Sequence, residues 1–102
     1  MTRKTKVLPP IHPGATLRED FLLPLGLSVS RLAIELQVPV TRVNDIVRAR
    51  RAITADTSLR LARYFRTTPQ FWMNLQSNYD LEVAQDARGD EIQERIRPYR
   101  AA

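Results

Sequence analysis

The chain of 102 residues contains no cysteine and only one histidine, His12. The lack of cysteine excludes a disulfide framework and a thiolate metal site, and one histidine cannot form a cluster of metal ligands. Because His12 precedes Pro13, we expect it in a loop or at the start of a helix rather than in a catalytic role. No nucleophile, base and metal ligand share a workable spacing. We therefore expect no enzyme, no metal site and no cofactor.

Long apolar runs are also missing, and none approaches the length of a membrane span. The cationic amino end lacks the apolar segment of a secretory signal. A chain of this length forms one domain that can bury a modest core without a metal or disulfide bonds. We expect a soluble, cytoplasmic protein that does not contact a membrane.

Positive charge is present but unevenly distributed. The net charge is +5, and residues 27–66 hold eight arginines against three acids, whereas residues 67–102 hold four arginines against six acids. A basic middle suits a polyanion, and an acidic end suits a basic protein. For the acidic end, a simple solvated surface explains the charge as well.

The spacing of apolar residues predicts an all-α fold with five helices. Their expected ranges are 13–23, 28–36, 39–48, 54–65 and 68–80, with Pro13, Ser28, Pro39, Thr54 and Thr68-Pro69 at their starts. The first helix is expected to end before Pro24 and Gly26. Beyond Asp80 the pattern weakens, and Gly89 interrupts it. We therefore divide the chain into a flexible arm (1–11), a helical domain that includes the fifth helix (12–81), and a C-terminal tail (82–102).

The ranges 28–36 and 39–48 match two short amphipathic helices joined by a tight turn, which is a helix-turn-helix. Their apolar faces are formed by Leu32, Leu36, Val43 and Ile46. Pro39 can open a helix but cannot continue one. A cluster of cations, Arg48-Ala49-Arg50-Arg51, follows directly, where such a unit meets a phosphate backbone. The pattern predicts a protein that binds double-stranded DNA.

The helix over 39–48 is the predicted recognition helix. Val43, Ile46 and Val47 face the core at helical spacing, so its other side chains face outward. In the major groove an arginine can pair with guanine, an asparagine with adenine, and methyl groups can contact a thymine methyl. Asp45 can either accept from cytosine or orient a neighbouring arginine. The outward-facing residues predicted to contact DNA are Val40, Thr41, Arg42, Asn44, Asp45 and Arg48.

Phosphate contacts are predicted on both sides of this helix. Ser28 and Ser30, at the start of the preceding helix, can donate hydroxyl and backbone N–H groups to a phosphate. Arg50 and Arg51 would bind the next phosphates. The plainer alternative is an ordinary polar surface helix, which leaves the clustering of cations on this unit unexplained.

The helix over 68–80 carries an apolar, mostly aromatic set: Phe71, Trp72, Leu75 and Tyr79. These side chains can pack into the core, or they can form a dimer interface, because a short aromatic helix at the end of a domain suits a twofold contact. A monomer would bind a DNA half-site weakly. We expect a homodimer in which both interpretations hold in part.

Residues 27–66 resemble the Cro/repressor-type (XRE) helix-turn-helix domain, and the span 11–81 resembles the HigA antitoxin family. The closer resemblance is carried by Arg50-Arg51-Ala52-Ile53-Thr54-Ala55-Asp56-Thr57, Leu59-Arg60-Leu61-Ala62, and Thr68-Pro69-Gln70-Phe71-Trp72-Met73-Asn74-Leu75-Gln76-Ser77-Asn78-Tyr79-Asp80-Leu81. It implies an antitoxin of a type II toxin–antitoxin module. Such a protein neutralises a HigB-like, RelE-type mRNA-cleaving toxin, and as a dimer it binds and represses the operator of its own operon.

The acidic end is a candidate surface for such a toxin, because a toxin that handles mRNA is expected to be basic. The acids are Asp80, Glu82, Asp86, Asp90, Glu91 and Glu94.

Two other functions stay open. A stand-alone repressor of the same fold would have no adjoining toxin gene. A protein-interaction module or RNA binder would fail a duplex-binding assay at two salt concentrations.

Three positions depart from the family pattern, which often has glycine where this chain has Gln37, Ala49 and Arg66. Each position follows or ends a predicted helix. We expect either a non-glycine residue with positive φ at these turns or a helix that ends differently.

Overall fold

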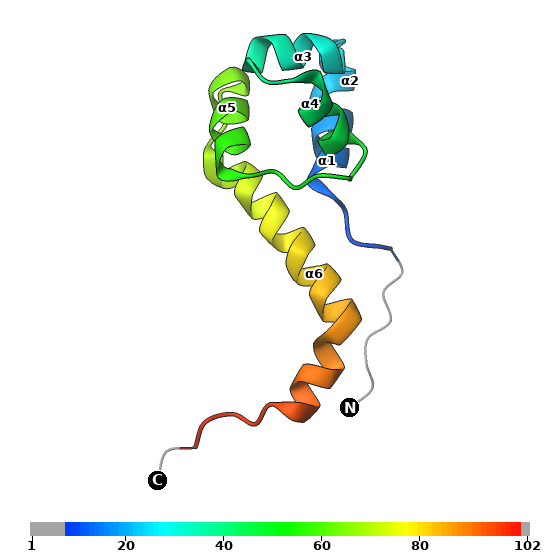
Figure 1. The fold of residues 1–102 in the computed structure, drawn as a ribbon, viewed down its shortest axis with the longest axis vertical. Coiled ribbons are helices and arrows are strands. Elements are labelled where there is room, and N and C mark those ends of the chain that lie inside the picture. Colours follow the sequence, from blue (N-terminus) through cyan, green and yellow to red (C-terminus); the bar gives the residue numbers. More distant parts are fainter. Residues whose placement is uncertain (1–7, 101–102) are drawn as a thin grey trace.

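A computed structural model describes residues 8–100. They form a group of short helices, called the head below, and one long helix that leaves it (Figure 1). Within that span the fold is all helical. The elements are α1 (Pro13–Thr16), the π-helical segment η1 (Leu17–Leu22), α2 (Leu23–Leu25), α3 (Val29–Leu36), α4 (Val40–Val47), α5 (Ala55–Phe65) and α6 (Pro69–Arg95). The predicted all-α fold is confirmed, with α1, η1 and α2 together forming the first predicted helix. Most of the predicted arm, residues 1–7, lies outside the described residues.

The first helix continues past Pro24, which corrects its predicted end. The backbone N–H of Leu23 donates to the carbonyl of Arg18, five residues earlier, as in a π-helix. Proline lacks the N–H that an α-helix would use, and its ring clashes with the carbonyl four residues back. The wider turn directly before Pro24 lets the helix continue to Leu25. It ends at Gly26, where φ is 61°.

The predicted caps are confirmed at three helices. The hydroxyl of Ser28 accepts from the backbone N–H of Arg31 at 3.0 Å, and that of Thr68 accepts from Phe71 at 3.1 Å. Thr54 caps α5 in the same way, although at a longer 3.4 Å. Each cap satisfies an N–H group that the first turn of its helix leaves without a partner.

The three glycine-lacking turns adopt the left-handed conformation. Gln37, Ala49 and Arg66 have φ of 59°, 60° and 61°. Gln37 ends α3 and Arg66 ends α5, while Ala49 follows the end of α4. Of the two outcomes expected at these positions, positive φ is therefore the one that occurs, and each side chain pays the steric cost of that conformation.

The core lies where the short helices meet the first turns of α6. Its largest fully buried side chains include Leu17, Leu32, Ile46 and Trp72. Trp72 is 0% exposed, and its indole N–H donates to the hydroxyl of Thr67 at 2.8 Å. A buried tryptophan with its N–H satisfied is a strong packing anchor. This residue fastens α6 to the head.

Helix α6 runs from Pro69 to Arg95 without a break, so the prediction that this helix ends near Asp80 is wrong. The predicted boundary after residue 81 falls inside this helix. A glycine costs a helix only about 1 kcal/mol, and Glu91 pairs with Arg88 at 3.2 Å and with Arg95 at 3.9 Å on the same stretch. These local interactions support a continuous helix.

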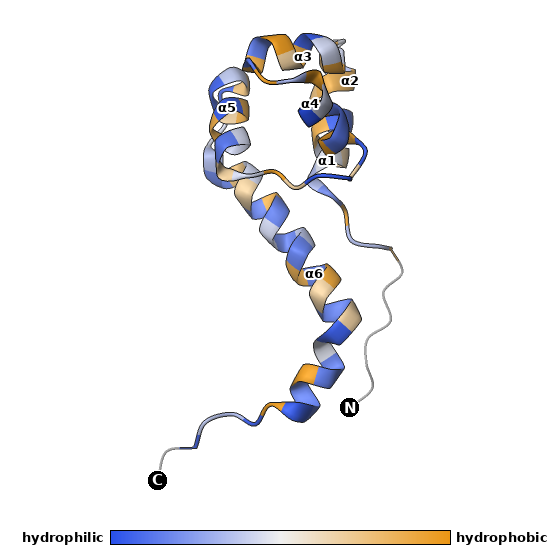
Figure 2. Cartoon of the chain, viewed as in Figure 1, coloured by the Kyte–Doolittle hydropathy of each residue, from blue (hydrophilic) through white to orange (hydrophobic). Residues whose placement is uncertain are grey.

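The second half of α6 extends away from the other helices (Figure 1). Helices α1 and α5 pack against α6 in the head. Farther along, Leu81, Val83 and Ile92 are exposed among hydrophilic residues (Figure 2). None of the described helices is both long and apolar enough to cross a membrane.

Candidate nucleic-acid interface

Helix α4 has the inward and outward faces that its spacing predicts. Val43 and Ile46 are buried, and Val47 is half-buried. Val40, Thr41 and Arg48 are exposed, whereas Arg42, Asn44 and Asp45 are partly covered by neighbouring groups. The apolar face anchors the helix in the core, so the polar face is presented on a rigid element.

The last turn of α4 packs closely on α1. A Cβ added at Gly14 would collide with the backbone carbonyl of Ile46. Only glycine therefore permits this approach of the two backbones. The packing fixes α4 from the side opposite its polar face.

Arg42 is held by an acid from the next helix. Its Nη1 lies 2.8 Å from Oδ2 of Asp56, at the start of α5. The Nε of Arg60 lies 2.9 Å from the same oxygen. These hydrogen bonds, first from Arg60 and then from Arg42, lower the pKa of the Asp56 carboxyl below its usual value. Asp56 is thus ionised at neutral pH and shared by two guanidinium groups.

Asp45 orients the arginines of the loop that follows α4. Its carboxylate lies 3.7 Å from Nη2 of Arg50 and 3.5 Å from Nη2 of Arg51. Of the two roles predicted for Asp45, the structure shows the pairing with neighbouring arginines. The pairing holds two cations near the end of the recognition helix.

The same loop is tied to α6 through a buried amide. The backbone N–H of Ile53 donates to Oε1 of Gln76 at 2.7 Å, and Nε2 of Gln76 donates to Asp80 at 3.0 Å. Gln76 is buried, so this contact fixes the far end of the arginine loop. One sequence signal of this contact is a polar residue four positions after Trp72, on the buried face of a helix.

Two further residues had no predicted site role. Arg60 and Asp56 both lie in stretches that carry the family resemblance. Their separation of four residues, with opposite charges, is the local pattern from which their pairing could be predicted. Nothing local indicates that Arg42 joins them, because it lies 14 residues before Asp56.

Ser28 and Ser30 are exposed at the start of α3. The hydroxyl oxygen of Ser28 accepts the cap hydrogen bond of α3, so a phosphate contact there would use the hydroxyl proton as the donor. The predicted phosphate role of both serines stays a prediction.

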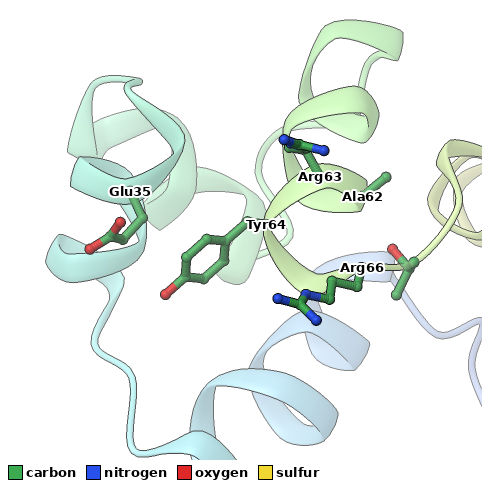
Figure 3. A pocket seen from close by; sticks show the side chains of 6 residues that line it. Glu35, Ala62, Arg63, Tyr64 and Arg66 are labelled. Carbon is green, nitrogen blue, oxygen red and sulfur yellow. The ribbon is translucent and has the colours of Figure 1, made fainter.

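Two hollows border these elements. One of about 220 Å³ lies between the recognition helix and α5 and is lined by Arg42, Arg51, Ala52, Thr54, Asp56 and Thr57. A wider one of about 780 Å³ lies between α3 and α5. In Figure 3, Glu35 from α3, Tyr64 from α5 and Arg66, directly after α5, border the wider hollow. No group of three or more potential metal ligands occurs among residues 8–100.

The aromatic set of α6 divides between core and surface. Trp72 is fully buried within one chain and has no surface to offer a second copy, which removes it from the predicted dimer interface. Leu75 is half-buried. The ring of Tyr79 packs edge-on against the ring of His12, with 4.9 Å between the ring centroids. Phe71 is 38% exposed. Phe71 is therefore the aromatic member of the predicted interface with the most free surface.

The chain is similar to known helix-turn-helix proteins. A family model described as Helix-turn-helix matches residues 17–72. Virulence-associated protein I of Dichelobacter nodosus is 54% identical over 78 residues, which cover 76% of this chain and 72% of that protein. The residues that match the family model include α4 and the loop after it.

Solved structures are similar over nearly the whole described chain. The Pseudomonas aeruginosa antitoxin HigA with the higBA promoter is 50% identical, with a TM-score of 0.86 over 89% of this chain and 99% of that one. An addiction module antidote protein of the HigA family from Coxiella burnetii is 44% identical, with a TM-score of 0.86 over 90% of this chain and 100% of that one.

Proposed function

Because the chain belongs to the HigA family of helix-turn-helix antitoxins, we propose that it binds operator DNA through α4 and the loop after it. This family consists of DNA-binding proteins rather than enzymes. The observation that carries the proposal is the pre-arranged cation set: Arg42 on the first turn of α4, and Arg50 and Arg51 beside Asp45. The proposal is supported by a structure of a homologue, the Pseudomonas aeruginosa antitoxin HigA, with the higBA promoter.

Within this interface Arg42 and Asn44 read bases. They project from the first turns of α4, where a docked recognition helix comes closest to base edges. Arginine can pair in bidentate fashion with guanine and asparagine with adenine. Val40 and Thr41 offer methyl groups to thymine from the exposed start of the same helix.

The arginines after α4 bind phosphates. Arg48, Arg50 and Arg51 lie beyond the part of the helix that enters the groove, and phosphate contacts hold a protein in place without reading sequence. Ser28 and Ser30 add contacts from the start of α3. The pairing with Asp45 reduces the entropy that Arg50 and Arg51 lose on binding.

Substitution separates the two roles. Arg42→Ala or Asn44→Ala should cost roughly 1–3 kcal/mol on the operator and much less on a random duplex. Arg50→Ala should weaken binding to the operator and to the random duplex alike. It should also reduce the slope of log affinity against log salt concentration by about one unit for each DNA-bound copy. Arg95→Ala, at the far end of α6, removes the same charge and should change neither the two affinities nor this slope. Equal losses for Arg42→Ala and Arg50→Ala on both duplexes would mean that α4 does not read bases.

We propose that the protein acts as a homodimer, since one copy would bind only a half-site. Among Phe71, Leu75 and Tyr79, Phe71 is the most exposed and is the candidate contact. The wild-type protein should sediment as a dimer at micromolar concentration, and Phe71→Ala should weaken both dimerisation and operator binding while circular dichroism stays unchanged. A wild-type monomer at that concentration contradicts this part of the proposal.

The antitoxin role rests on the projecting half of α6. We propose that this acidic segment contacts a basic, HigB-like mRNA-cleaving toxin in the cytoplasm, and that the dimer represses its own operon. The segment leads away from the head (Figure 1), so a toxin there leaves α4 free. Deleting residues 82–102 should abolish toxin binding and spare operator binding. Unchanged toxin affinity would place the contact on the head or the amino-terminal arm.

A further inference from the structure

We propose that Asp56 is a specificity-determining residue, which fixes the guanidinium of Arg42 for base reading and is itself held by Arg60. The inference rests on the proposed DNA-binding function, and it assigns a role to two residues outside the recognition helix. Its basis is a continuous chain of charged contacts that joins α3, α4 and α5.

The first contact sets the position of Arg42. Nη1 of Arg42 donates to Oδ2 of Asp56 at 2.8 Å, and the Arg42 side chain is only 29% exposed. A guanidinium has five N–H donors in a planar fork. With Nη1 engaged by Asp56, the other nitrogens remain for the O6 and N7 acceptors of guanine.

The second contact sets the position of Asp56. Nε of Arg60 donates to the same Oδ2 at 2.9 Å. Nη1 of Arg60 donates to the carbonyl of Leu36 at 2.8 Å and, more weakly, to that of Gln37 at 3.4 Å. These carbonyls end α3, where helix termini leave acceptors without partners. Arg60 therefore anchors the carboxylate to the turn of the helix-turn-helix.

Pre-ordering favours the correct sequence over others. Fixing a free arginine side chain costs rotamer entropy, and here that entropy is lost on folding rather than on binding. A guanidinium held in one position also cannot swing to the nearest phosphate of a wrong sequence. This restriction penalises incorrect sites as well as rewarding the correct one.

The charge of Asp56 also favours the correct sequence over others. Its carboxylate lies beside the cation that reads bases, and a phosphate that approached Arg42 would be repelled by it. The acid thereby lowers the general attraction for DNA and leaves the sequence-specific contact intact. A merely structural role, as a favourable charge in the first turn of α5, would instead alter affinity for every duplex equally.

The test is Asp56→Asn, which keeps the size of the side chain and removes its charge. The measured quantity is the ratio of dissociation constants for a random duplex and for a duplex of equal length that the wild-type protein selects from a random library. We expect this ratio to fall about tenfold, the loss of one arginine–guanine preference. Affinity for the random duplex should stay equal or rise.

Glu35→Gln is the matched control, because Glu35 is an acid of α3 paired with Arg31 at 3.0 Å. It should leave the ratio unchanged. In an Arg42→Ala background, Asp56→Asn should have no further effect on the ratio, since the residue acts through Arg42. The Asp56 side chain is 56% exposed, so its replacement does not open the core, and thermal melting verifies folding.

The outcomes separate the inference from the function beneath it. A wild-type protein that selects no duplex overturns the proposed function. A wild-type protein with a clear preference, and an Asp56→Asn variant with the same ratio or a higher one, overturns the inference alone. A ratio that falls equally in the presence and absence of Arg42 also overturns it.

Discussion

The side-chain oxygen of Gln76 accepts the backbone N–H of Ile53 at 2.7 Å, and so joins the third turn of α6 to the loop that carries the arginines. Both partners are buried. A buried N–H of this kind has no access to water, and its loss of a partner costs more than the bond contributes.

Gln76→Leu should therefore destabilise the protein. The substitution keeps the volume and leaves the N–H of Ile53 unpaired, so we expect a loss of about 1–3 kcal/mol in the free energy of unfolding. Urea denaturation measures it. Gln85→Leu, at an exposed position of the same helix, is the control and should change stability little. Equal stability of the two variants would mean that the Ile53 N–H finds another partner.

Ala49→Gly should stabilise the protein. Ala49 has φ of 60°, a conformation that costs a residue with a Cβ about 1 kcal/mol and costs glycine almost nothing. Thermal melting should show the gain. The same change at Ala84, an exposed position inside α6, should destabilise by a similar amount because glycine weakens a helix interior. Opposite signs for the two variants identify the backbone as the cause.

Gly14→Ala should be the most damaging single methyl addition in the head. The new Cβ would meet the carbonyl of Ile46, which cannot move without shifting the last turn of α4. We expect a loss of about 3 kcal/mol or more, at the upper end for overpacked cores. Gly89→Ala provides the contrast, because its Cβ would make only an ordinary contact with Gln85. That variant should be slightly more stable.

Acid should weaken the protein through His12. Burial lowers the pKa of its imidazole from the ordinary 6.5, and Asp80 opposes this shift in part. Its Nδ1 also accepts from the N–H of Gly14 at 2.9 Å, which caps α1. The unfolded state then takes up the proton more readily than the folded state. The stabilisation is complete above about pH 6.5 and is lost as pH falls through 6.5 toward the lowered folded value.

Urea denaturation between about pH 7.5 and about pH 5.5 measures this loss, in a range where most carboxylates stay ionised. His12→Asn is the control, since asparagine can cap a helix and does not titrate. Its stability should vary less over the same range. A wild-type protein with a flat profile would show that His12 is protonated equally in both states.

Local rules explain why much of the fold is predictable from the sequence. Ser28, Thr54 and Thr68 begin their helices as predicted because capping depends on a side chain and its own next turn. The turns at Gln37 and Ala49 followed from comparison with a family pattern that has glycine there. The left-handed conformation persists because the flanking helices determine it.

The features that the sequence did not predict depend on contacts between distant segments, or on the absence of such contacts. Apolar periodicity reports packing, and the second half of α6 lacks the pattern because it projects from the head. Its helical form follows instead from propensity and ion pairs. Trp72 was assigned to core or interface alike, since burial within one chain and between two uses the same side chains. The link from Arg42 to Asp56 requires the folded arrangement of α4 and α5.

The length of α6 also sets how readily its backbone hydrogen bonds open at each position. Trp72 lies in the core, so we expect the amide protons around it to exchange with solvent only when the whole domain unfolds. Those near Arg95 are covered by nothing beyond the helix itself, so fraying exposes them directly. Exchange rates should rise along α6 toward its carboxyl end. Any partner that binds the projecting half would slow exchange there, at amides whose protection the head does not provide.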